Sequence, residues 1–186
     1  MAGPALGAPQ AVMLLENLAA AGVREVWVWG WCGSLREELS PGTILVPEKA
    51  LSAEGTSAYY LPGTCTLFPE PELVAEWKKL LSQVPIKIFS GTVVSTDAPY
   101  REDESFWRRF RDQALAVDME CSALFAAARK LRVKLAAALL VTDRLSPEGH
   151  ERLPSSVRRE IFEALLPAFR RIMQEGPGTA RAPKTT

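Results

Sequence analysis

Apolar residues follow two spacings along this chain. In some segments they recur every three to four residues, the period of a helix with one buried face. Other segments are short and apolar on both faces, which is typical of strands inside a parallel sheet. The spacing predicts helices over 10–21, 69–82, 103–113 and 155–174. Strands are predicted over 23–31, 43–47 and 85–95.

The stretch 115–145 combines both spacings, in the order LAVDMECSALFAAARKLRVKLAAALLVTDRL. It predicts a buried strand, an amphipathic helix and a second buried strand. Strands that alternate with helices indicate an α/β fold with a mostly parallel sheet. We expect a single domain over 1–174, whose last helix Pro167 kinks or splits. The tail 175–186 is rich in Gly, Pro, Thr and Lys and is predicted to be disordered.

Charge and cysteine content narrow the classes of protein. Lys+Arg and Asp+Glu are both 22, so the formal net charge is zero and gives no argument for nucleic-acid or membrane binding. The three cysteines lie far apart, without the spacing of a metal site or a disulfide framework, and favour a cytoplasmic protein. No apolar run approaches the roughly 18 residues of a membrane span, and no signal peptide is evident. His150 is the single histidine, in an expected loop over 146–154, which argues against a Ser/His/Asp triad and most zinc sites.

Acidic residues follow both strands of the stretch 115–145. Asp118, Met119 and Glu120 fall where the first strand turns into the helix, and Asp143 falls where the second strand ends. If the two strands are parallel neighbours, both exits open on the same edge of the sheet, where α/β proteins place their ligands. Two further strand exits are candidates for ligand binding: the expected turn at Cys32-Gly33-Ser34 and the loop 96–102.

Each acid has a structural and a functional interpretation. Glu120 at a helix N-terminus should stay ionised, and it is either a simple N-terminal acid or a ligand for a vicinal diol such as a ribose. Asp143 follows a strand without a polar face, so it is either a cap or a general acid with a raised pKa. Met119 packs in the core or against a sugar. Tyr100 is either an ordinary loop residue or a stacking partner for a base.

A set of motifs occurs in a fixed order along the chain: GAPQA, GWCGSL, PGTILVP, EGTSAYY, VVSTDAPYRE, VDMECSALF and LLVTDRL. In this order, from roughly Gly3 to Gln174, the chain resembles the nucleoside phosphorylase superfamily. This superfamily includes uridine phosphorylases, hexameric purine nucleoside phosphorylases and methylthioadenosine/S-adenosylhomocysteine nucleosidases. The resemblance implies a three-layer αβα fold around a mixed, mostly parallel sheet, and a homo-oligomer.

The resemblance also implies an activity and a set of site residues. Such enzymes cleave the N-glycosidic bond of a nucleoside with phosphate or water, through a transition state like an oxocarbenium ion. By this resemblance Met119 and Glu120 bind the ribose, and Asp143 handles the base at N7. An aspartate at this position favours a purine, whereas Arg144 matches an arginine that uridine enzymes use. The remaining implied positions are Ser95, Thr96, Tyr100 and Asp118 for the base, and Cys32, Gly33 and Ser34 for the phosphate loop.

The chain departs from the family pattern where phosphate would bind. Family members carry a further strand-rich stretch before the GAPQA loop, so we expect this chain to lack the family's first strands. Val28 stands at the position of a phosphate-binding arginine, and Trp31 at that of a serine or threonine. No cofactor or metal is implied, only phosphate as a co-substrate. The alternative is a weak or inactive relative that binds nucleosides or serves a structural role.

Overall fold

The computed structural model describes residues 2–146 and 149–175. The helices are α1 (Ala8–Ala20), α2 (Ser57–Tyr60), α3 (Pro71–Leu81), a 3-10 turn η1 (Pro99–Arg101), α4 (Glu104–Phe110), α5 (Cys121–Leu131) and α6 (Ser155–Glu175). The strands are β1 (Glu25–Ser34), β2 (Ile44–Ala53), β3 (Thr66–Leu67), β4 (Ile88–Thr96), β5 (Ala116–Asp118), β6 (Lys134–Ser146) and β7 (Gly149–Arg152). The predicted tail lies outside the described residues, except Glu175, which ends α6.

The strands form one mixed sheet in the order β3-β2-β4-β5-β1-β6-β7. The long ladders are parallel, between β1 and β6 and between β2 and β4, and β4 also runs parallel to β5. A further antiparallel contact between β2 and β6 closes five of the strands into a ring. The antiparallel β5–β1 contact is confined to Gly33 and Ser34 of β1.

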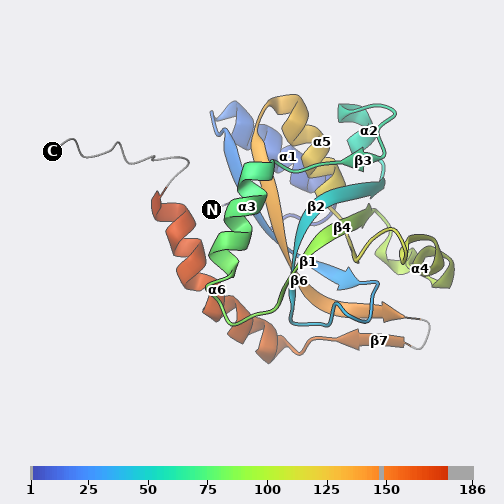
Figure 1. The fold of residues 1–186 in the computed structure, drawn as a ribbon. Coiled ribbons are helices and arrows are strands. Elements are labelled where there is room, and N and C mark those ends of the chain that lie inside the picture. The colour runs from blue at the N-terminus through green and yellow to red at the C-terminus, as the bar shows by residue number, and fades with distance from the viewer. Residues whose placement is uncertain (1, 147–148, 176–186) are drawn as a thin grey trace.

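Helices cover both faces of this sheet, as Figure 1 shows. The helices α1 and α5 pack on one face around a core that includes Leu15, Phe125 and Leu139. The helices α3 and α6 cover the other face, where Trp77 and Leu165 are buried. The three-layer arrangement around a mixed sheet confirms the predicted fold class. Within the described residues, no helix has the length and apolarity needed to cross a membrane.

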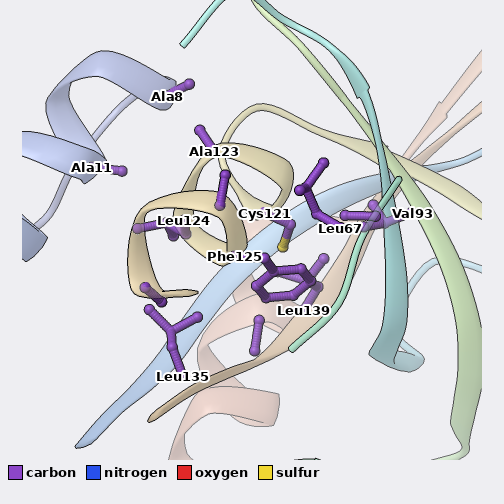
Figure 2. Packing of buried hydrophobic residues seen from close by; sticks show 14 of the residues in the cluster. Ala8, Ala11, Leu67, Val93, Cys121, Ala123, Leu124, Phe125, Leu135 and Leu139 are labelled. Carbon is purple, nitrogen blue, oxygen red and sulfur yellow. The ribbon is translucent and has the colours of Figure 1, made fainter. Parts of the chain in front are cut away.

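Helix α5 lies at the centre of the first core. Its first eight residues, 121–128, are all buried, so the helix is enclosed by protein on most sides. Figure 2 shows Cys121 and Phe125 pointing towards the sheet, with Ala8 of α1 on another side of the helix. Arg132 ends the helix in the left-handed conformation, with φ of 56°. This enclosure fixes the N-terminus of α5 relative to the sheet.

The topology corrects several predictions about the strand exits. The strands β5 and β6 are not parallel neighbours: β1 lies between them and runs antiparallel to β5. Cys32, Gly33 and Ser34 do not form a turn, because β1 continues through Ser34 while pairing with β5 and β6. Asp143 does not end its strand either, since β6 runs on to Ser146.

The segment after β6 also differs from the expected loop. It contains β7, which pairs antiparallel with residues 143–146 of β6 and includes the backbone of His150. Helix α6 then runs through Pro167 without a break. Figure 1 shows this helix bending along its course, so the proline bends the helix and does not divide it.

Candidate active site

The carboxylate of Glu120 is anchored from the N-terminal loop. The backbone N–H of Gly7 donates to Glu120 Oε1 over 2.6 Å. Gly7 has φ of 82°, which favours glycine, and a side chain there would approach Cε of Met119 to 3.9 Å. Glu120 precedes the first residue of α5 and is half-buried. The loop before α1 and the start of α5 therefore form one wall of the site.

The electrostatics of Glu120 differ from the prediction for a helix N-terminus. Burial raises the pKa of Glu120, and the nearby charge of Asp118 raises it further, while the N–H of Gly7 acts in the opposite direction. The backbone N–H of Met119 also donates towards this carboxylate and acts to lower the pKa. Because a carboxylate has about four acceptor positions, Glu120 can still accept a hydrogen bond from a ligand.

Both carboxylate oxygens of Asp118 accept hydrogen bonds from the protein. Ser95 Oγ donates to Oδ1 over 2.5 Å, and the N–H groups of Cys121 and Glu120 donate to Oδ2 over 2.8 and 3.2 Å. Burial raises the pKa of Asp118, and these donors oppose the rise. Ser95 Oγ also accepts from the N–H of Ser122. Asp118 and Ser95 therefore cap α5 and hold it to β4.

Asp143 lies beside the backbone of β1. In the β1–β6 ladder it is opposite Gly33, at a point where the register shifts. A Cβ on Gly33 would come within 3.1 Å of Asp143 Oδ2, so glycine is what lets the carboxylate approach the strand. Thr142 Oγ1 donates to Asp143 Oδ1 over 2.8 Å. Because Gly33 pairs with both Val117 and Asp143, the register brings Asp118 and Asp143 to the same end of the sheet.

Glu102 is a third acid of this region that sequence reasoning missed. It follows η1 in the loop after β4 and is half-buried. Burial raises the pKa of Glu102 to about 7, with further contributions from the charges of Asp143 and Asp118. A carboxyl that titrates near neutrality can take up and release a proton under ordinary conditions. Its place at the end of the VVSTDAPYRE motif was the available signal.

A second missed residue is Glu54, at the end of β2. Its carboxylate accepts from the hydroxyls of Ser52 and Ser122, each over 2.9 Å, and from the N–H groups of Thr56 and Ser57. Burial acts to raise the pKa of Glu54, but these donors together outweigh it and lower the pKa. Ser122 belongs to α5, so Glu54 ties the EGTSAYY segment to the same helix.

The other predicted base-binding residues lie in different surroundings. Thr96 is buried, and its Oγ1 accepts from the N–H of Ala98 within the loop. Tyr100 is fully exposed and covers no part of the site. Arg144 forms an ion pair with Glu151 across the β6–β7 hairpin, with Nη2 and Oε2 2.9 Å apart. Adjacent strand residues project to opposite faces, so Arg144 is directed away from Asp143.

The predicted phosphate-loop residues form the C-terminal end of β1. Cys32 is buried, and burial, together with the charges of Asp118 and Asp143, raises the pKa of its thiol well above the usual range. The thiol is therefore not a thiolate nucleophile. Ser34 Oγ donates to the carbonyl of Arg36 and accepts from its N–H, which fixes the turn after the strand. No cluster of three potential metal ligands occurs among residues 2–146 and 149–175.

The structure thus brings together Gly7, Gly33, Glu102, Glu120 and Asp143 around the capped start of α5. It offers an anchored carboxylate, a half-buried acid held against backbone and a carboxyl that titrates near neutrality. Such a set can accept hydrogen bonds from a polyol and can move a proton to a leaving group. None of these five residues is basic, so the set contains no positive charge for a phosphate.

Relatives of this chain among known proteins include nucleoside phosphorylases. A guanosine phosphorylase from Halorubrum lacusprofundi is 26% identical over 167 residues, which cover 86% of this chain and 69% of that protein. A purine nucleoside phosphorylase of the DeoD type from Alkaliphilus metalliredigens is 27% identical over 173 residues, covering 88% of this chain and 71% of the relative. The chain thus spans about 70% of the length of these relatives.

Solved structures share the fold. The crystal structure of AMP nucleosidase from Bacteroides thetaiotaomicron superimposes with a TM-score of 0.73 at 25% identity, covering 91% of this chain and 70% of that one. Uridine phosphorylase from Vibrio fischeri gives 0.71 at 23% identity, with 89% and 66% covered. The family model described as "Phosphorylase superfamily" matches residues 1–175. The chain belongs to the phosphorylase superfamily.

Proposed function

We propose that this protein cleaves the N-glycosidic bond of a nucleoside, with a purine nucleoside favoured over uridine. The observation that carries the proposal is the Gly7–Glu120 hydrogen bond at the start of α5, close to the acids Asp143 and Glu102. Membership of the phosphorylase superfamily supports it, as do relatives named guanosine phosphorylase and purine nucleoside phosphorylase.

In this proposal Glu120 and Met119 bind the sugar. Oε1 of Glu120 is held by the N–H of Gly7, and the remaining acceptor positions of the carboxylate accept from the hydroxyls of a ribose. Met119 lies against the same loop and offers an apolar surface to the sugar ring. Fixing the ribose in this way positions its anomeric carbon for bond cleavage.

On the base side, Asp143 and Glu102 assist departure of the leaving group. Cleavage leaves electron density on the base, and a protonated acid lowers its cost by donating to a ring nitrogen. Asp143 is assigned to N7 of a purine, and Glu102 supplies or replaces the proton. Because Arg144 is paired with Glu151, it does not offer its charge to a uracil carbonyl, which favours the purine assignment.

The nucleophile is phosphate or water. Val28 packs against the core, and Trp31 is largely exposed. Neither side chain carries a cation or a hydroxyl that could bind a phosphate dianion. The structurally similar proteins include both a nucleosidase and a phosphorylase. The three free cysteines suit a cytoplasmic enzyme.

Release of free base tests the proposal. The protein is incubated with guanosine, inosine, adenosine, AMP and uridine, with and without phosphate, and the base is followed by chromatography. Base release that Asp143→Asn and Glu120→Gln diminish, while the exposed-site control Asp112→Asn does not, is the expected result. Dependence on phosphate identifies phosphorolysis, and independence identifies hydrolysis.

A nucleoside-binding protein is the second candidate. Val28 and Trp31, which stand where the family carries phosphate-binding residues, favour this candidate. Calorimetry separates the two: nucleoside binding without any base release supports the binding protein. Absence of both binding and release contradicts both candidates.

A further inference from the structure

Arg152 of β7 lies directly opposite Asp143 of β6 in the antiparallel β6–β7 ladder. The N–H of Leu153 donates to the carbonyl of Thr142 over 2.7 Å, so Asp143 and Arg152 form a non-hydrogen-bonded pair. In such a pair the two side chains lie on the same face of the sheet, with their Cβ atoms about 5 Å apart. Figure 1 shows β7 running back along the end of β6. The hairpin therefore places a cation beside the acid that the proposed function assigns to the base.

This pair lies on the side of the sheet that faces the loop after β4. Leu145 follows Asp143 by two residues, so it is on the same face, and it packs against a cluster that contains Phe110 of α4. Glu102 lies in the loop that leads into α4, and the charge of Asp143 contributes to its raised pKa. Arg152 is therefore on the same side of the sheet as Asp143 and Glu102.

The protein does not use the charge of Arg152 in an ion pair between described residues. Arg152 is exposed, and those ion pairs do not include it. Its neighbour Glu151 projects to the opposite face and is paired with Arg144. An arginine stays protonated at any ordinary pH and presents five N–H donors in one plane. Arg152 thus brings a donor to a ligand that is bound at Asp143.

The acceptor that suits Arg152 is found on the purine edge that carries N7. N7 and the substituent on C6 are neighbours on this edge. In guanine and hypoxanthine the substituent is a carbonyl oxygen, O6, which accepts hydrogen bonds. In adenine it is an amino group, which donates them. A protein group beside N7 can therefore distinguish 6-oxopurines from 6-aminopurines by the direction of one hydrogen bond.

Asp143 and Arg152 can present two donors side by side to that edge. In its protonated form Asp143 donates to N7, as the proposed function requires, and the guanidinium of Arg152 donates to O6. Adenine would instead turn N–H groups towards the guanidinium, and neither donor would find an acceptor. The pair is thus complementary to guanine and hypoxanthine and not to adenine.

We propose that Arg152 is a specificity-determining residue that donates to O6 of the base, so that the protein prefers the 6-oxopurine nucleosides guanosine and inosine to adenosine. The proposal rests on the proposed function, because it takes N7 of the base to lie at Asp143. It also assigns a role to β7, since this strand carries the cation and its pairing with β6 sets the distance to Asp143.

Base release from inosine, purine riboside and adenosine tests the proposal, because these nucleosides carry a carbonyl, a hydrogen and an amino group at C6. In the wild type, kcat/KM for inosine is expected to exceed that for adenosine at least about tenfold, with purine riboside between them. Arg152→Ala is expected to reduce this ratio to about threefold or less, and Arg152→Lys, which keeps a donor, to retain part of it. Glu151→Gln is the matched control, because it changes the adjacent residue of β7 on the opposite face and should leave the ratio unchanged.

Calorimetry with inosine and adenosine separates the two proposals. If base is released but the wild type shows no preference for inosine, or Arg152→Ala lowers the ratio no more than Glu151→Gln does, the role of Arg152 is overturned and the proposed function stands. If no nucleoside releases base, the proposed function fails, and tighter binding of inosine than of adenosine that Arg152→Ala abolishes supports the role of Arg152. Equal binding of the two nucleosides, or none, then overturns that role as well. Thermal denaturation checks that each variant folds.

Discussion

The backbone N–H of Gly7 donates to the carboxylate of Glu120, joining residues 113 positions apart in the chain. Gly7 adopts φ of 82° to reach this position. The contact closes the N-terminal loop over the start of α5 and orients the acid that the proposed function assigns to the sugar. Its two residues come from different elements, so each can be tested separately.

Replacing Gly7 by alanine should affect both stability and nucleoside binding. The positive φ costs about 1 kcal/mol for a residue with a side chain. The displaced loop should also weaken nucleoside binding about tenfold or more, as loss of a hydrogen bond to a charged group does. Gly22→Ala is the control, since Gly22 has φ of 93° and no neighbour within 4 Å of an added Cβ. Denaturation and calorimetry should show similar destabilisation in both variants but weaker binding in Gly7→Ala alone.

Gly33→Ala should act on Asp143. The new Cβ lies 3.1 Å from Asp143 Oδ2, which forces the carboxylate away from β1. Gly30→Ala on the same strand brings a Cβ within 3.1 Å of Leu139 Cδ2, a flexible apolar atom. Base release should fall about tenfold or more in Gly33→Ala and change little in Gly30→Ala at similar thermal stability. Equal activity in the two variants would separate Asp143 from the reaction.

Glu102 should make the protein less stable as the pH rises from about 4.5 to about 7. In this window the unfolded chain releases the proton of Glu102 while the folded chain keeps it, so ionisation favours the unfolded state. Glu102→Gln removes the effect. Relative to the wild type, its free energy of unfolding should increase between pH 4 and pH 8 by roughly 1–2 kcal/mol, after allowance for partial solvent exposure. Urea denaturation at both pH values measures it, with the exposed Glu37→Gln as control.

Glu54 should have the opposite pH dependence. Its pKa is lowered in the folded state, so its stabilising effect is present above about pH 4.5 and is lost as the pH falls through the lower folded value. Glu54→Gln places an amide opposite the N–H donors of Thr56 and Ser57 and should cost about 2 kcal/mol at pH 7. Glu48→Gln, which breaks an exposed ion pair with Lys78, should cost less than about 1 kcal/mol. A similar loss of unfolding free energy in both variants would show that the hydrogen bonds of Glu54 stabilise the protein no more than an exposed ion pair does.

The spacing of apolar residues was sufficient to locate most helices and strands. Residues 121–128 are small or apolar all round and became the enclosed part of α5, as the pattern of 115–145 predicts. Hydrophobic periodicity reports whether a segment has one buried face or two, and that property is local. The motifs identified the family for the same reason, since they are short segments in a fixed order.

Pairing between distant segments was not visible in that pattern. The expectation that the strands before and after α5 are neighbours fails because β1 lies between them. Asp118 and Asp143 nevertheless lie at the same end of the sheet, since Gly33 is opposite Val117, the neighbour of Asp118, in one ladder and opposite Asp143 in the other. Similarly, β7 was missed because a four-residue polar strand has no apolar alternation to reveal it.

By itself, the sequence determined the layers of the fold and singled out the acids Glu120 and Asp143 as candidate site residues. Tertiary structure decided which groups surround them. It engages the oxygens of Asp118 as a cap, holds Glu120 with Gly7, and buries Glu102 beside two other acids. These properties depend on burial and on charges brought close across the sheet, and neither is encoded by the order of neighbouring residues.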